Sequence, residues 1–243
     1  MTTLIIDADT ILYQSLSNAE NEVEFDEDVW MMTCDHRQAR SSFDDRIDWL
    51  MKTSDADDYI LCFSHSENFR KDVYPLYKAN RKKLRKPMGF KEFREKVQYD
   101  YNYRVKPRLE ADDVVGILAT KMDDCIIYSE DKDLLQIPGK HMKDEATIEV
   151  TTYEADRFHM LQTLTGDPVD GYPGCPGIGP VKAEKLLGND PSAWWGVVVD
   201  TYTKAGLTEK DALRMARVSR ILRLSDWDME RQEPILWTPT TKQ

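Results

Sequence analysis

The sequence predicts an α/β fold in which a mainly parallel central sheet is flanked by helices and followed by a helical C-terminal subdomain. Short apolar runs typical of buried strands alternate with amphipathic, helix-like stretches through the first part of the chain. After Tyr153 the strand signal fades, and residues 166–179 are rich in Gly and Pro, which indicates turns between helices. We therefore expect a core over residues 1–150 and a smaller helical subdomain over residues 151–243.

Strand and helix patterns alternate from the first residues onward. Residues 3–6 form an apolar run before Asp7, typical of a buried strand, and residues 10–16 have apolar side chains near helical spacing. Residues 29–51 carry apolar side chains among many charges, which favours an amphipathic helix over a strand. Residues 59–63 are the next expected strand.

The alternation continues through the middle of the chain. Residues 91–97 and 110–122 are expected helices, and residues 101–105 and 125–128 are expected strands. Near the end, Thr208-Glu209-Lys210-Asp211 has the capping-box pattern, which predicts a long helix up to about residue 224.

The charge of the chain is unevenly distributed. The net charge of −11 argues against a nucleic-acid partner, because Lys and Arg contacts to phosphates dominate duplex binding. Residues 70–96, however, hold eleven Lys or Arg and three Asp or Glu, a local charge of +8. This segment is either a solvated basic helix or a phosphate-binding surface.

The composition also indicates where in the cell the protein is expected. The longest apolar stretches, such as residues 194–199, are far shorter than the roughly 20 residues of a membrane-spanning helix, and no leader-like segment opens the chain. The four cysteines are dispersed without zinc-type pairing, so we expect them to be reduced. We therefore expect a soluble, cytoplasmic protein with no membrane partner.

Acidic residues follow strand-like runs at several places. In an open α/β sheet, the carboxyl ends of the strands border the ligand crevice. Carboxylates gathered there repel one another unless a hard cation neutralises them, so the pattern predicts a magnesium or manganese site. Taken singly, each cluster also fits a solvated surface loop or an acidic first turn of a helix. The clusters are Asp7 with Asp9, Glu110 with Asp112 and Asp113, Asp131 with Asp133, and Asp167 with Asp170.

Two further motifs are suited to phosphate. Gly177 and Gly179 stand directly before a predicted helix, where exposed backbone N–H groups favour an anion, and Lys182 and Lys185 add charge. This stretch has the form of a helix-hairpin-helix, although an ordinary helix connection shares the pattern. Separately, the basic run at residues 77–83 places Lys and Arg side chains where they could stabilise a phosphate under attack.

Taken in order, these motifs resemble those of the 5′ nuclease family, the flap-endonuclease-like enzymes built on a PIN-type α/β core. The resemblance covers residues 3–187 and is similar to the stand-alone exonucleases of short-tailed bacteriophages. The order of motifs is Ile6-Asp7, Tyr77-Lys78-Ala79-Asn80-Arg81, Glu110-Ala111-Asp112-Asp113, Ser129-Glu130-Asp131-Lys132-Asp133, and Gly166-Asp167-Pro168-Val169-Asp170-Gly171 before the hairpin.

The resemblance implies roles for the acidic residues. A first, catalytic metal is expected at Asp7, Glu110, Asp112 and Asp131, with Asp113 beside them. A second metal is expected at Asp133, Asp167 and Asp170. The cofactor is thus expected to be Mg²⁺ or Mn²⁺, as two ions.

The same resemblance implies roles for the basic residues. Lys78 and Arg81 match the pair that approaches the scissile phosphate, and residues 75–96 match an arch or gateway. The hairpin is expected to grip duplex DNA, with a K⁺ ion as a further expectation there. The DNA-binding set is expected to comprise Arg70, Tyr77, Lys82, Lys83, Gly177, Gly179, Lys182 and Lys185.

One position departs from the family pattern. Relatives carry an acidic residue after the strand at residues 59–63, whereas Ser64-His65-Ser66 stands here. An imidazole is a poorer partner for magnesium than a carboxylate, so the periphery of the metal site is expected to differ.

The combined prediction is a metal-dependent 5′→3′ exonuclease that acts on duplex DNA. Flap cleavage and RNA-primer removal from RNA–DNA hybrids are related activities that the resemblance implies. A monomer in the host cytoplasm is expected. The alternatives are a DNA-binding scaffold without catalysis and a PIN-type ribonuclease, which would act on single-stranded RNA.

Overall fold

A six-stranded sheet forms the centre of the fold. The computed structural model describes residues 1–83 and 85–239, except for the side chains of Lys82 and Lys83. The strand order of the six-stranded sheet is β5-β4-β1-β6-β7-β8, and all neighbouring strands are parallel except β7 and β8. The mainly parallel sheet is thus confirmed. The strands are β1 (Thr3–Asp7), β4 (Asp58–Cys62), β5 (Tyr103–Arg104), β6 (Cys125–Tyr128), β7 (Gly139–Lys143) and β8 (Ala146–Val150).

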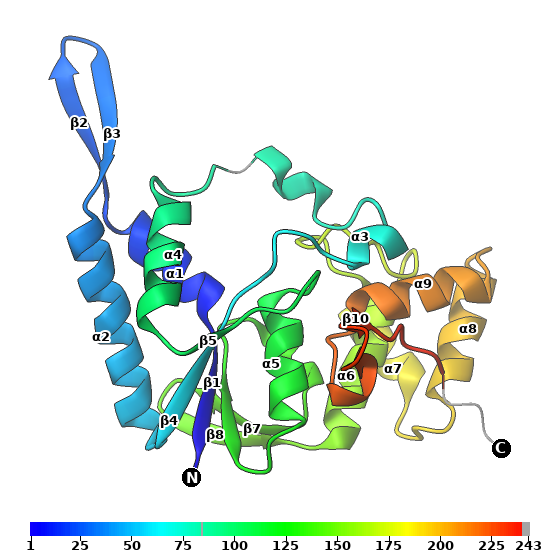
Figure 1. Ribbon diagram of the computed structural model, residues 1–243. Helices are drawn as coiled ribbons and strands as arrows, with labels where there is room; N and C mark the ends of the chain where they lie inside the picture. Colours follow the sequence, from blue (N-terminus) through cyan, green and yellow to red (C-terminus); the bar gives the residue numbers. More distant parts are fainter. Residues whose placement is uncertain (84, 240–243) are drawn as a thin grey trace.

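Helices cover both faces of the sheet (Figure 1). Strand β1 is buried along its whole length, and its side chains alternate between the two faces. Leu4 and Ile6 pack in a cluster with helices on one face, whereas Ile5 packs in the cluster on the other. An uninterrupted apolar run is what a strand covered on both faces requires. The first face carries α1 (Ala8–Ser17), α2 (His36–Ser54) and α4 (Phe90–Asp100), and the second carries α5 (Ala111–Ala119).

The remaining helices gather beyond the sheet around a third apolar cluster. Thr208 and Asp211 form the predicted capping box at the start of α9, but this helix ends at Ser219, before the expected residue 224. The chain then returns to the core, where Leu222 and Trp227 pack beside α5. These helices are α6 (Thr152–Thr165), α7 (Pro180–Leu187), α8 (Trp194–Lys204) and α9 (Glu209–Ser219), followed by η3 (Leu224–Asp226), β9 (Trp227–Asp228) and β10 (Glu233–Pro234).

The predicted helix over residues 29–51 is wrong in its first part. Val29–Cys34 is strand β3, which pairs with β2 (Glu20–Asp26) as an antiparallel ribbon. The helix begins only at His36, where the Asp35 side chain accepts hydrogen bonds from the backbone N–H groups of Arg37 and Gln38. Apolar and polar side chains are mixed across this stretch, so periodicity alone did not separate ribbon from helix.

A segment of irregular chain crosses above α5 from one side of the molecule to the other (Figure 1). It follows α3 (Arg70–Val73), includes η1 (Ala79–Lys83) and leads into α4. We call residues 74–83 and 85–89 the crossing segment. The last part of the expected arch lies in α4, whose Phe93 and Val97 are buried in the core. Among the described residues, no helix has the length and apolarity that a bilayer crossing requires.

Candidate active site

Three expected metal-binding carboxylates lie near one edge of the sheet. Asp7 is the last residue of β1, Asp131 follows β6, and Asp112 lies in the first turn of α5. The carboxyl ends of parallel strands share one edge, which explains why residues far apart in sequence meet here. Burial and the charges of Asp9 and Asp131 raise the pKa of Asp7 to about 7. Burial and the charges of Asp7 and Asp131 likewise raise the pKa of Asp112 well above its usual range.

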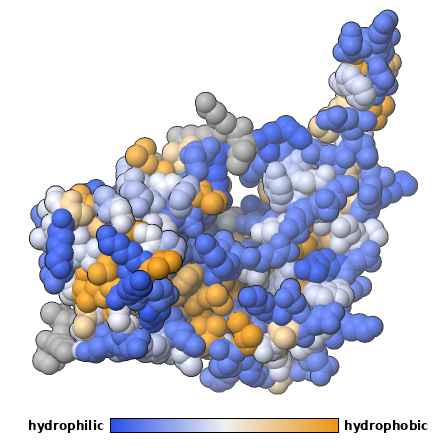
Figure 2. All heavy atoms as spheres, turned by 180° about the vertical axis from the view of Figure 1, so that it is seen from behind, coloured by the Kyte–Doolittle hydropathy of each residue, from blue (hydrophilic) through white to orange (hydrophobic). Residues whose placement is uncertain are grey.

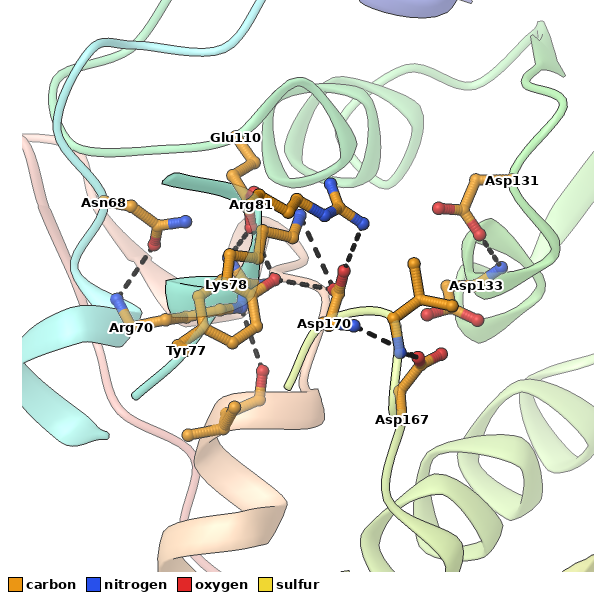
Figure 3. A network of polar contacts seen from close by, with 12 residues as sticks. Asn68, Arg70, Tyr77, Lys78, Arg81, Glu110, Asp131, Asp133, Asp167 and Asp170 are labelled. Carbon is orange, nitrogen blue, oxygen red and sulfur yellow. Dashed lines mark hydrogen bonds and ion pairs between the residues drawn. The ribbon is translucent and has the colours of Figure 1, made fainter. Parts of the chain in front are cut away.

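A second group of side chains links Glu110 and Asp170 to the crossing segment (Figure 3). The Tyr77 hydroxyl lies 2.8 Å from Glu110 Oε2 and 2.9 Å from Asp170 Oδ2. Lys78 Nζ donates to Glu110 Oε1 at 2.5 Å, and an Arg81 N–H donates to Asp170 Oδ1 at 2.7 Å. Burial works to raise the pKa of Glu110, but the charges of Lys78 and Arg70 lower it to about 2.

The backbone also fixes the crossing segment to the 166–171 loop. The Lys78 N–H donates to the carbonyl of Asp170 at 2.7 Å, and Lys78 itself adopts a left-handed conformation with φ of 53°. Gly171 has φ of 76°, and a Cβ added there would lie 3.3 Å from the carbonyl oxygen of Leu76. A larger residue at position 171 would therefore both strain the turn and crowd the crossing segment.

Asp133 and Asp167 lie toward the other side of the group in Figure 3. Asp133 Oδ1 is buried and has no hydrogen-bond partner among the described residues, and burial together with the charge of Asp131 raises the pKa of Asp133 to about 6. Asp167 accepts from the backbone N–H groups of Val169 at 2.7 Å and Asp170 at 3.2 Å, which shapes the 166–171 loop. Asp131 in turn accepts from the Asp133 N–H at 2.9 Å.

The donor set fits a hard divalent cation in its chemistry. Within residues 1–83 and 85–239, no group of three or more Asp, Glu, His or Cys side chains is already arranged to hold a metal ion. Lys78 and Arg81 instead contact the oxygens of Glu110 and Asp170. The unpaired Asp133 oxygen and the raised pKa values of Asp7 and Asp112 nevertheless show negative charge without sufficient compensation. Oxygen ligands of this kind suit Mg²⁺ or Mn²⁺.

Arg70 and Asp113 lie in the interior, and Arg70 also contacts Glu110 Oε2 at 3.3 Å. The side chains of Arg70 and Asp113 form a two-pronged ion pair with distances of 2.6 and 2.7 Å, and Asp113 is fully buried. Arg70 also donates to the carbonyls of Val218 at 2.9 Å and Arg220 at 2.6 Å. The expected DNA contact of Arg70 and the expected metal contact of Asp113 do not agree with this burial. Both residues join α3, α5 and the segment after α9.

Tyr77 is also buried, so its ring does not present the surface on which a nucleobase would stack. It packs in the third apolar cluster, near Tyr172, and directs its hydroxyl to Glu110 and Asp170. The side chains of Lys82 and Lys83, which the sequence predicts to contact DNA, lie outside the described part of the chain.

The predicted hairpin has an open, glycine-lined turn. Gly177 has φ of 73°, Gly179 caps α7 and Pro180 opens it, as is favourable for the first helical position. A Cβ added at either glycine would meet no atom of the described residues within 4 Å, and both glycines are exposed, so the backbone there is accessible to a ligand. Lys182 and Lys185 are exposed on the helix that follows.

Two residues that were not predicted as metal ligands lie beside the carboxylates, and one of them, Asp9, belongs to the first acidic cluster of the sequence. The Ser129 hydroxyl donates to Asp7 Oδ2 at 3.0 Å, and Asp9 Oδ2 accepts from the Ser64 N–H at 2.9 Å. The position of Asp9, two residues after Asp7, was a usable signal, because both lie where β1 passes into α1. His65 accepts from the Glu67 N–H through Nδ1 at 3.1 Å and thus organises the turn after β4.

Comparisons with known proteins identify related sequences. Residues 2–163 match the family described as 5′-3′ exonuclease, N-terminal resolvase-like domain. The chain is 32% identical to an exodeoxyribonuclease of Enterobacteria phage T3 over 97% of this chain and 92% of that protein. It is 31% identical to an exonuclease of Escherichia phage T7 over 97% of this chain and 93% of that protein.

Solved structures show the same fold. A zinc-bound T5 5′-exonuclease superposes with a TM-score of 0.66 at 16% identity, covering 90% of this chain and 89% of that one. A T5 flap endonuclease in a pseudo-enzyme–product complex with DNA and metal ions gives a TM-score of 0.64 over the same shares, also at 16% identity. The order of the acidic clusters, the family match and the full-length relatives lead to one assignment. The chain belongs to the 5′-3′ exonuclease family and is a nuclease.

Proposed function

We propose that the protein is a metal-dependent 5′→3′ exonuclease that removes nucleotides from the 5′ ends of duplex DNA, with flap cleavage and RNA-primer removal as related activities. The observation that carries this proposal is the group formed by Asp7, Asp112 and Asp131 at one edge of the sheet, with Glu110 and Lys78 beside it. The two phage relatives are named as exonucleases, and this chain matches them over nearly their whole length, which favours the same activity.

The carboxylates would hold two Mg²⁺ or Mn²⁺ ions. Such ions supply an activated water and neutralise charge on the reacting phosphate. Asp7 is held by Ser129, and Asp131 is held by its contacts with the backbone, so both oxygen donors have fixed positions. The first ion is assigned to Asp7, Glu110, Asp112 and Asp131, and the second to Asp133, Asp167 and Asp170.

Lys78 and Arg81 are the groups that would meet the phosphate. The side chain of Lys78 is 18% exposed and that of Arg81 is 43% exposed. A phosphate therefore reaches Arg81 more easily than Lys78. Each cation now contacts a carboxylate that a metal ion would also attract. A fixed cation aimed at developing negative charge stabilises a transition state without further reorganisation.

The α7 hairpin would hold the duplex by its backbone. Open glycines before α7, together with Lys182 and Lys185, suit phosphate contacts that carry no base information. A K⁺ ion bound by carbonyls of the hairpin is part of this proposal. We further propose that the enzyme acts as a monomer in the cytoplasm of the host cell.

The direct test is Asp131→Ala on a 5′-labelled duplex with Mg²⁺. We expect cleavage to fall by roughly a factor of 10³ or more, the scale of losing a principal electrostatic group. Asp144→Ala, in the exposed β7–β8 turn, is the matched control and should cleave normally. Unchanged cleavage by Asp131→Ala would refute the assignment.

A substrate panel separates this proposal from its rivals. Duplex DNA, flap DNA, RNA–DNA hybrid and single-stranded RNA are compared with and without a chelator. Cleavage of single-stranded RNA alone would favour a PIN-type ribonuclease. Duplex binding without chelator-sensitive cleavage would favour an inactive scaffold.

A further inference from the structure

The β2–β3 ribbon projects from the body of the molecule and is the most prominent feature outside the nuclease site (Figures 1 and 2). Its base is held where Glu20 pairs with Arg85 at 2.7 Å and accepts from the Met88 N–H at 2.8 Å. Farther out, Phe25 and Trp30 are 75% and 60% exposed. An isolated two-stranded ribbon is only marginally stable in water, so apolar side chains left exposed on it indicate a surface that another molecule covers.

The two faces of the ribbon differ in chemistry. Val23 lies opposite Met31, so these two half-exposed apolar side chains share one face. Glu22 and Glu24 lie on the other face, because side chains alternate along a strand, and there they stand opposite Met32 and Trp30 of β3. The β2 edge of the ribbon therefore presents Val23 on one face and Glu22 and Glu24 on the other.

The charge of the ribbon restricts its partner. Residues 20–34 contain six Asp or Glu and no Lys or Arg. Such a surface repels the phosphates of DNA, and it repels a second copy of the same ribbon. A basic protein surface is the partner that this charge attracts.

The open edges define the shape of that partner. Among the described residues, β2 and β3 pair only with each other, so each strand keeps one edge with unpaired backbone groups. A strand added to such an edge directs alternate side chains to the two faces. We propose that the β2–β3 ribbon docks an extended segment of a partner protein in which apolar and basic residues alternate, the apolar ones against the Val23–Met31 face and the basic ones against Glu22 and Glu24.

The probe for this proposal is a synthetic peptide of alternating Lys and Leu. Its controls are a Lys/Ser peptide, which lacks the apolar side chains, and a Glu/Leu peptide, which lacks the positive charge. Calorimetry gives affinity, and backbone amide NMR of the full chain gives location. We expect the Lys/Leu peptide to bind at least about tenfold more tightly than either control, a difference of ~1.4 kcal/mol, with shifts concentrated in residues 20–34.

Two variants test the two faces. Glu22→Lys with Glu24→Lys should lose the Lys/Leu peptide and gain the Glu/Leu peptide, because the two charges that face the peptide are reversed, while the charge of residues 20–34 falls from −6 to −2. Val23→Ser with Met31→Ser should bind all three peptides weakly. The charge-reversed variant keeps both apolar residues, so its gain of a new peptide also demonstrates that the ribbon is folded. Both variants should degrade duplex DNA at the normal rate.

Other occupants give different results. Peptide-induced shifts outside residues 20–34, or no gain by the charge-reversed variant, would overturn the proposal. Ribbon shifts caused by a short DNA duplex, or slower DNA degradation by the variants, would assign the ribbon to DNA instead. Sedimentation that detects self-association abolished by these variants would assign it to a second copy of the chain.

Discussion

Replacement of Arg70 by Met is expected to destabilise the protein strongly, although the sequence pattern placed Arg70 among the DNA contacts. The substitution removes the guanidinium and leaves Asp113 buried without its partner. Asp113 would still accept from the N–H groups of Glu110 and Leu222, at 3.2 and 3.1 Å. These two hydrogen bonds reduce the loss of stability but do not neutralise the charge of Asp113.

The magnitude follows from the burial of both partners. Removing one member of a buried ion pair costs about 3–5 kcal/mol, because the remaining charge has no compensation. The carbonyls of Val218 and Arg220 lose donors as well, which places the expected cost toward the upper part of that range. For a chain of this size the midpoint of thermal unfolding should fall by roughly 6–20 °C.

The assay is urea unfolding followed by circular dichroism, with a chelator present. Arg70→Lys keeps the charge but loses the two-pronged geometry, so we expect a smaller loss of about 1–3 kcal/mol. Adding Asp113→Asn to Arg70→Met removes the orphaned charge, so the double variant should lose less than the two single losses combined.

One pair of results would refute this reasoning. If the free energy of unfolding of Arg70→Met lies within about 1 kcal/mol of that of the unaltered protein, the buried pair does not stabilise the fold. If the same variant lowers the salt dependence of duplex binding by about one phosphate contact, Arg70 contacts DNA after all.

The other predictions concern charge at the site and the hairpin. Asp7 has a pKa of about 7 in the folded protein, whereas the ordinary pKa of 3.8 applies in the unfolded chain, so stability without metal should fall as the pH rises between those two values. Asp7→Asn should reduce this slope, leaving the part due to Asp112 and Asp133, and add up to ~4 kcal/mol at neutral pH in urea unfolding; an unchanged slope would contradict the assignment. Lys78→Met should slow cleavage by roughly 10²–10³ and raise the pKa of Glu110 by NMR titration, whereas exposed Lys210→Met should do neither. Lys182→Ala with Lys185→Ala should weaken binding to all duplex sequences alike and reduce the salt slope by about two; a sequence-dependent loss would contradict a backbone grip.

The central sheet and the first carboxylates were predictable because their signals are local. A continuous apolar run that ends in Asp7 specifies a strand covered on both faces, and parallel pairing then brings Asp131 to the same edge. The capping box at Thr208 needed only four residues of context. Predictions of this kind depend on neighbours in sequence, not on long-range packing.

Long-range contacts account for the misplaced residues. Arg70 and Asp113 are 43 positions apart, and each carries a charge that sequence reasoning assigns to the surface or to a ligand. Only the packing of α3 against α5 and the segment after α9 makes them a buried pair. The β2–β3 ribbon was missed for a related reason. Its two strands are stabilised by pairing with each other, and the periodicity of apolar residues within one strand does not reveal that pairing.

The contacts of Tyr77 link the metal pocket to the crossing segment. A phenol has one proton, so its hydroxyl cannot fully satisfy Glu110 Oε2 and Asp170 Oδ2 at the same time. Lys78 supplies the missing positive charge, contacting Glu110 at 2.5 Å and Asp170 at 3.5 Å. A metal ion at these carboxylates would compete with Lys78 for the same oxygens and free its ammonium group for a phosphate. With a metal ion at Glu110 and Asp170, the position of the crossing segment and the affinity for that ion would be coupled through the carboxylate oxygens that Tyr77 and Lys78 contact.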